Sequence, residues 1–175
     1  MKRYAILAAA GILAAACGSK TPTTPSNTQP NSIVFTAALA ATNEVPPITN
    51  ADRDARGTGT FTLNLTRDGA GTITAATATF VYSLSGFPAG TQIRLTHIHE
   101  GGPAVTGTVV VDTGLTAANP ITLADGTLTN QTFSNISVTV PLANQIIANP
   151  NGYYFNVHSG LNPGGAVRAQ LVRQP

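Results

Sequence analysis

Apolar and polar residues alternate along most of the chain after residue 31, with the period of two that is typical of strands with one buried face. The alternation is strict in Phe61-Thr62-Leu63-Asn64-Leu65, and Phe80, Tyr82 and Leu84 share one side of residues 79–85. Threonine, which is β-branched and favours strands, occurs 26 times. Further strands are predicted at residues 33–41, 91–99, 106–113, 133–140, 153–158 and 166–173.

Turn-forming residues separate these segments and indicate how the strands connect. Asp68-Gly69 follows a predicted strand and is expected to supply the positive φ of a hairpin turn. Residues 141–148 are the one predicted helix, a short connector with a proline in its first turn and an end before Asn149-Pro150. Short strands joined by Gly, Pro and Asn predict an all-β fold: an antiparallel, Greek-key-like β-sandwich over residues 32–175.

All three histidines of the chain lie in two of the predicted strands. His97 and His99 are two positions apart, so they point to the same side of an extended segment. If Ile98 and Val157 face the core, then His97, His99 and His158 all point outward. The alternation therefore predicts that the three imidazoles converge on one face.

The apolar residues before the histidines place a condition on this arrangement. Ile93 and Leu95 have the same parity as His97 and His99. Convergence of the histidines on the outer face therefore requires a β-bulge between Leu95 and His97, or a strand that starts late.

The first 31 residues have a different composition. Lys2 and Arg3 precede an apolar run at residues 5–16 that has the length of a signal peptide, so residues 1–16 are predicted to be removed. Cys17, the only cysteine, follows directly. Residues 18–31 contain three prolines and no large apolar side chain, so residues 17–31 are predicted to be a flexible, disordered tether.

Cys17 resembles the cysteine of a bacterial lipobox, where lipoproteins are cleaved and lipidated. The resemblance implies a stable lipid anchor in a membrane and a domain outside the cytoplasm, in the cell envelope. The residue two places after the cysteine is Ser19 and not aspartate. If the lipoprotein pattern applies, this implies sorting to the outer membrane in a diderm cell. The alternative is an ordinary secretory signal, which would leave a lone reactive thiol.

The charge balance excludes one class of partner. Of the nine Lys and Arg residues, Lys2 and Arg3 leave with the signal peptide, so seven basic side chains remain beside seven acidic ones. The remaining bases are Lys20 and six scattered arginines, without the clustering that displaces counterions from a phosphate backbone. Nucleic acid is therefore not a predicted partner.

Four separated motifs carry a family resemblance: Phe35-Thr36-Ala37-Ala38-Leu39 leading to Asn43-Glu44-Val45-Pro46-Pro47, then Gly57-Thr58-Gly59, His97-Ile98-His99-Glu100-Gly101-Gly102, and Tyr154-Phe155-Asn156-Val157-His158 with Gly164-Gly165-Ala166-Val167-Arg168. In this order they resemble a chordin (CHRD) domain over essentially all of residues 32–175. The resemblance implies a secreted β-sandwich without a settled activity. The first hypothesis is therefore a lipid-anchored, non-enzymatic module that binds a protein, a glycan or a small ligand through its loops.

The His-x-His strand and the closing Gly-Gly-x-x-Arg strand are also similar to parts of copper-zinc superoxide dismutase. That similarity implies that His97, His99 and His158 stand where copper ligands would, while the loop histidines, their aspartate and the disulfide of that family are missing. Three neutral imidazoles with an open position suit copper or zinc. The alternative is structural: the histidines bond backbone carbonyls or pair with Glu100, and so order the glycine-rich turn.

Other polar residues beside the motifs complete the candidates. Arg168 is predicted to pair with Glu44 or Glu100, and with Asn156 they form a structural or ligand-binding polar cluster. Asp52 is predicted to lie in a solvated loop rather than in a calcium site. No catalytic residue is predicted, because the chain lacks a Gly-x-Ser-x-Gly elbow, a phosphate-binding loop and readable paired carboxylates.

Overall fold

The computed structural model describes residues 29–175. The predicted signal peptide and the lipidation site at Cys17 lie outside these residues, as does most of the predicted tether. Among the described residues, no helix is long and apolar enough to cross a membrane.

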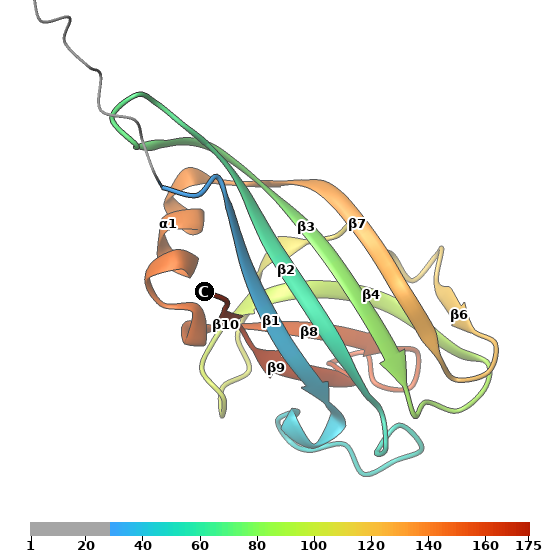
Figure 1. Ribbon diagram of the computed structural model, residues 1–175. Coiled ribbons are helices and arrows are strands. Elements are labelled where there is room, and N and C mark those ends of the chain that lie inside the picture. Colours follow the sequence, from blue (N-terminus) through green and yellow to red (C-terminus); the bar gives the residue numbers. More distant parts are fainter. Residues whose placement is uncertain (1–28) are drawn as a thin grey trace, which may run out of the picture.

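The strands form one antiparallel sheet that curls into two layers (Figure 1). The strand order is β5-β4-β8-β9-β1-β2-β3-β7, with β10 paired to β1 and β6 paired to β4. The prediction of an antiparallel all-β sandwich with one short helix is therefore confirmed. The elements are β1 (Ser32–Ala40), η1 (Ala41–Asn43), β2 (Arg56–Arg67), β3 (Ile73–Ser85), β4 (Thr91–Glu100), β5 (Thr108–Asp112), β6 (Ile121–Leu123), β7 (Leu128–Val138), α1 (Val140–Ala148), η2 (Pro150–Gly152), β8 (Tyr153–Ser159), β9 (Val167–Gln170) and β10 (Val172–Arg173).

An aromatic cluster joins the two layers in the middle of the sandwich. Phe80 of β3 contacts Phe61 of β2 at a centroid distance of 5.1 Å and Phe155 of β8 at 5.4 Å, both edge to face. Tyr82 also meets the Phe155 ring at 5.9 Å. All four side chains are buried, so the alternating positions recognised in the sequence do form the core.

The hairpin between β2 and β3 forms where it was predicted, but its turn differs. Oδ1 of Asp68 accepts hydrogen bonds from the backbone N–H groups of Ala70 and Thr72, both at 2.9 Å. The positive φ of 88° belongs to Gly71, not to Gly69. The expectation that Asp68-Gly69 supplies the positive φ was wrong, because the aspartate side chain closes a longer loop than a two-residue turn.

The helix α1 begins and ends close to the predicted limits. Oγ1 of Thr139 accepts a hydrogen bond from the N–H of Leu142, and a proline stands in the first turn. Ala143 and Ile146 face the core, and the helix connects β7 to β8. It delivers the chain to the strand that carries the last histidine.

Strand β4 contains the bulge that the sequence required. Its register against β8 shifts between Ile93 and Leu95, two positions before the expected place. Because of the shift, Ile93 and Ile98 are both buried in the core in spite of their opposite parity. The bulge thereby turns His97 and His99 to the outer face of the layer.

Candidate functional site

The outer face of the layer formed by β4, β8 and β9 is polar and covered. Every residue of β8 is buried, so loops cover its outer side as the core covers its inner side. His97 lies opposite Asn156 on β8, and Asn156 lies opposite Arg168 on β9. The face therefore brings together residues from two of the sequence motifs, the His97-Ile98-His99 motif and the closing motif.

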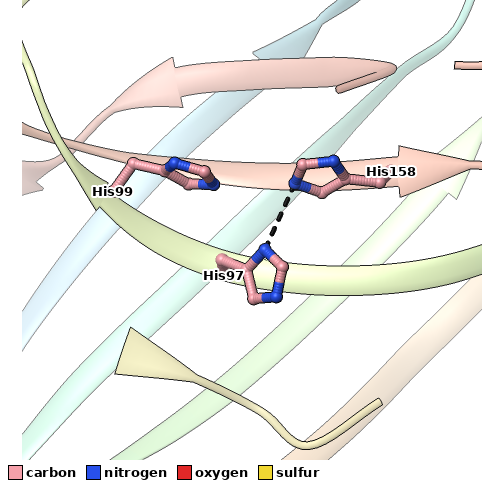
Figure 2. Close-up of side chains that lie close together, drawn as sticks. All are labelled: His97, His99 and His158. Atoms are coloured by element: carbon pink, nitrogen blue, oxygen red, sulfur yellow. Dashed lines mark hydrogen bonds between the residues drawn. The ribbon is translucent and has the colours of Figure 1, made fainter. Parts of the chain in front are cut away.

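The three histidines converge on this face as predicted. His97, His99 and His158 each contribute one ring nitrogen to a set of three nitrogens that lie within 4.8 Å of one another. Nδ1 of His97 is 3.3 Å from Nε2 of His158, the contact drawn as a dashed line in Figure 2. The side chains are 5 %, 7 % and 4 % exposed, so the cluster lies just below the surface.

The remaining nitrogens of the three rings are held by oxygen atoms. Nδ1 of His99 lies 3.0 Å from the carbonyl oxygen of Gly107, and Nδ1 of His158 lies 2.9 Å from that of Pro163. Nε2 of His97 lies 3.5 Å from a carboxylate oxygen of Asp112. Protons on these three nitrogens would leave Nε2 of His99, Nε2 of His158 and Nδ1 of His97 as bare lone pairs, the pattern that metal-binding histidines show.

Without a metal, neutral His97 cannot satisfy both of its neighbours. Nε2 of His158 accepts, since Nδ1 of that ring donates to Pro163, so His97 must donate from Nδ1. Nε2 of His97 would then carry no proton, and its lone pair would face the negatively charged Asp112 carboxylate. In addition, Nε2 of His99 is buried and has no hydrogen-bond partner. A cation among the three nitrogens removes both conflicts at once.

Burial keeps the three rings neutral. Desolvation is the main cause that lowers the pKa of His97, with the Asp112 carboxylate acting in the opposite direction. The pKa of His99 is also lowered by burial. For His158, burial lowers the pKa to about 4, and the hydrogen bond to Pro163 only partly opposes this. Neutral imidazole is the form that binds a metal.

Arg168 covers one end of the histidine cluster, but it does not form the predicted ion pair. Its guanidinium carbon lies 3.5 Å from the centroid of the Tyr154 ring, and that ring stacks on His99 at 4.9 Å. The guanidinium donates to the carbonyl oxygens of Gly102 and Val105, each at 3.0 Å. Arg168 therefore holds the loop after β4 over the cluster.

Neither of the carboxylates expected to pair with Arg168 forms an ion pair with it. Glu44 is buried near Arg168, but no ion pair joins the two side chains among the described residues. Burial raises the pKa of the Glu44 carboxyl group to about 7, and the charge of Arg168 only partly opposes this. Glu100 is exposed at the end of β4, so its predicted pairing with a histidine or with Arg168 is wrong. The strand alternation explains this, because Glu100 has the opposite parity to His97 and His99.

Asn156 of β8 and Glu44, which follows η1, approach each other beside this face, and each has a buried oxygen without a hydrogen-bond partner. Oδ1 of Asn156 and Oε1 of Glu44 are buried and have no partner. A Cβ on Gly165 would lie 2.7 Å from Oε2 of Glu44 and 2.8 Å from Nδ2 of Asn156, so glycine is required where these side chains approach the backbone. The predicted polar cluster thus contains Glu44, Asn156 and Arg168 but not Glu100.

Asp52 is buried, although the sequence predicted that it lies in a solvated loop. It is 1 % exposed and accepts hydrogen bonds from Ser159 Oγ at 2.6 Å and from Asn162 Nδ2 at 2.7 Å. These bonds fasten the loop before β2 to the loop after β8. The expectation of a solvated loop was wrong for this residue, because its partners lie more than 100 positions away in the chain.

The comparisons with known proteins identify the family of this chain. A family model for the CHRD domain matches residues 35–171, which is most of the sequence. No curated protein and no solved structure matches the chain, and the resemblance to copper-zinc superoxide dismutase stays a prediction. The family model spans all four motifs that suggested the resemblance, and the chain belongs to the CHRD domain family.

Proposed function

We propose that this CHRD domain is a lipid-anchored module of the cell envelope that holds one copper or zinc ion with His97, His99 and His158. Membership of the family supports a non-enzymatic module of extracellular type. The observation that carries the metal proposal is the convergence of three ring nitrogens within 4.8 Å. The opposite nitrogen of each ring has its own oxygen partner.

The donor set indicates which metals fit. Three neutral imidazoles leave one coordination position open, as in zinc sites that bind an exogenous ligand, and imidazole also suits copper. Two nitrogens that lie about 2.0–2.1 Å from a tetrahedral metal are about 3.3–3.4 Å apart, and the His97–His158 contact is 3.3 Å. His99 completes the set by a small movement of its ring toward the other two.

The proposed activity is metal binding rather than dismutation. The chain contains three histidines, and all of them belong to this one cluster. No histidine is left for a second, zinc-type site of the kind found in copper-zinc superoxide dismutase. The sandwich then serves as a rigid frame that presents the ion just below the surface.

Metal analysis of the mature, detergent-extracted protein tests the proposal. After reconstitution with copper or zinc and extensive dialysis, the wild type is expected to retain one ion per chain. His97→Ala and His158→Gln are expected to retain none. Leu161→Ala, which changes an exposed side chain of a neighbouring loop, serves as the control and should bind like the wild type.

Two results would contradict the metal proposal. One is a wild-type protein that retains no stoichiometric ion. The other is retention of a full equivalent by both histidine variants, provided that circular dichroism shows them to be folded. Either result would favour the structural alternative, in which the histidines only bond backbone oxygens.

The anchor is proposed from Cys17 and is tested separately. The wild type is expected to fractionate with membranes, with the outer membrane in a diderm cell, and to incorporate a fatty-acid analogue. Cys17→Ala should lose both properties, since lipidation of this cysteine attaches the chain to the bilayer. Unchanged fractionation of the variant would exclude the anchor without affecting the metal proposal. The further partner of the loops is proposed to be an extracytoplasmic protein, glycan or small ligand.

A further inference from the structure

Two clefts lie on either side of Glu44, apart from the histidines. One has a volume of about 490 Å³ and includes Pro103, Ala104 and Arg168. The other has a volume of about 420 Å³ and is formed mainly by the segments 44–50 and 161–165. Glu44 belongs to the lining of both clefts, and none of the three histidines belongs to either.

The Glu44 carboxyl group is buried without a donor. The side chain is 6 % exposed, and Oε1 has no hydrogen-bond partner. The backbone N–H of Glu44 donates to the carbonyl oxygen of Ala41, which fixes the backbone of the residue at this position. An ionised carboxylate in such surroundings is costly unless a cation or several N–H groups approach it.

The described residues do not supply that cation. Arg168 is the nearest charge, but its guanidinium is engaged by the carbonyl oxygens of Gly102 and Val105 and by the Tyr154 ring. Asn156 lies beside Glu44 at Gly165 but belongs to the lining of neither cleft. Glu44 therefore lines both clefts as a carboxyl group without a cation of its own.

The rest of the lining is suited to an apolar stem. Val45, Pro47, Pro103 and Ala104 contribute hydrocarbon surface to the larger cleft, and Val45 is partly exposed at its rim. A long side chain can bury its methylene groups against such a surface while its charged head reaches the acceptors. A guanidinium group carries five N–H donors in a planar fork and can serve two neighbouring acceptors at once.

We propose that the clefts around Glu44 bind an arginine side chain of a partner protein, with the Glu44 carboxylate as the counter-charge. The site is independent of the proposed metal site. Through this site, the loops of the domain would recognise a partner protein by a guanidinium group on an apolar stem.

A titration with N-butylguanidinium tests this site with the smallest probe that has both features. Backbone amide shifts of the isotope-labelled mature protein are expected to saturate around residues 43–47 and 102–105, with a dissociation constant of roughly 1 mM. Glu44→Gln should weaken the affinity at least about tenfold, because the counter-charge is lost. Glu100→Gln, at an exposed carboxylate of the same layer, should leave it unchanged.

N-butylurea, which has nearly the same shape but no charge, is the matched probe and should bind at least about tenfold more weakly than N-butylguanidinium. The proposal is overturned if the cation causes no saturable shifts, if Glu44→Gln binds it as tightly as the wild type, or if the urea binds equally well to the wild type. The last comparison needs no variant, so it holds even if Glu44→Gln folds poorly. Metal retention by the same samples separates this result from the test of the histidine site.

Discussion

Three buried polar atoms without partners lie on or beside one face of the molecule. They are Nε2 of His99, Oδ1 of Asn156 and Oε1 of Glu44. A buried acceptor without a donor costs about 1–3 kcal/mol, and a protein retains this cost most readily where a ligand removes it. The histidine nitrogen is assigned here to a metal, and the Glu44 oxygen to an arginine side chain of a partner protein.

Asp112 is expected to increase metal affinity without binding the metal. Its carboxylate lies 3.5 Å from Nε2 of His97. When a metal takes Nδ1 of His97, the proton moves to Nε2, and Asp112 would accept the hydrogen bond from Nε2 and orient Nδ1 toward the other rings. Asp112→Asn should weaken the binding of zinc or copper about 10- to 100-fold, the usual effect of removing such an outer partner. Competition with a chromophoric chelator measures the change.

The side chain of Asp112 is 58 % exposed, so the substitution should leave the melting temperature of the metal-free protein nearly unchanged. Asp54→Asn, at a side chain that is 74 % exposed, is the control and should retain the wild-type affinity. Equal affinities for the Asp112 variant and the wild type would show that His97 does not need this orientation.

Glu44→Gln is expected to change how stability depends on pH. Burial raises the pKa of Glu44 from 4.5 to about 7, although the charge of Arg168 acts to lower it. The folded state therefore holds the proton more tightly than the unfolded state. The resulting stabilisation is complete below about pH 4.5 and is lost as the pH rises through about 7. A glutamine is neutral at every pH, so the variant keeps this stabilisation as the pH rises.

Urea unfolding of the metal-free protein at several pH values between about 4.5 and 8 measures this difference. The free energy of unfolding of Glu44→Gln minus that of the wild type should increase with pH across this range. Subtraction is needed because the lowered pKa values of the three histidines make the opposite contribution, which is present above about pH 6.5 and is lost as the pH falls. For His158 the loss extends to about pH 4. Parallel pH profiles would show that Glu44 is ionised without penalty.

At the scale of the elements, the site depends on a bulge and on a strand with two buried faces. The shift between Ile93 and Leu95 turns His97 and His99 outward while Ile98 stays in the core. Strand β8 then contributes Phe155 and Val157 to the core and Tyr154, Asn156 and His158 to the covered outer face. One strand thereby connects the packing of the sandwich to the chemistry of the site.

Gly57→Ala is expected to destabilise the pairing of β2 with β3. An added Cβ would collide with the carbonyl oxygen of Ser83 and lie 2.9 Å from Cδ2 of Leu84. The backbone oxygen cannot move without distorting the ladder, so the free energy of unfolding should fall by about 1–3 kcal/mol. Gly69→Ala is the matched control in the hairpin between the same strands, where the Cβ meets open space, and it should change stability by less than about 0.5 kcal/mol. Similar urea midpoints for the two variants would contradict the clash.

At the scale of the whole molecule, the histidine cluster fastens segments from different parts of the chain. His99 bonds the loop before β5, His158 bonds the loop after β8, and His97 contacts the end of β5. An ion that fixes the three rings would therefore stabilise the closure of the sandwich at its β5 edge.

Metal is expected to raise the melting temperature of the wild-type protein. At a free concentration of about 100 times the dissociation constant, binding adds about 2.7 kcal/mol, which corresponds to roughly 5–10 °C for a domain of this size. Scanning calorimetry with and without zinc measures the shift, and His97→Ala should show none. An equal shift in the variant would mean that the ion binds elsewhere.

The residue pattern by itself determined the class of fold, most strand positions, the hairpin, the helix and the common direction of the three histidines. These features follow from alternation, turn residues and caps, which act between neighbours in the chain. The short strand β6 (Ile121–Leu123) was missed because three residues are too few to show a period.

Only the tertiary structure decided which side chains meet. Arg168 bonds carbonyl oxygens of the loop after β4 rather than a carboxylate, Asp52 is buried by residues of a distant loop, and Glu44 lies between two clefts. These contacts join segments that lie about 60 to more than 100 positions apart. Local propensities do not reach that far, because the register of the strands and the course of the covering loops determine which segments become neighbours.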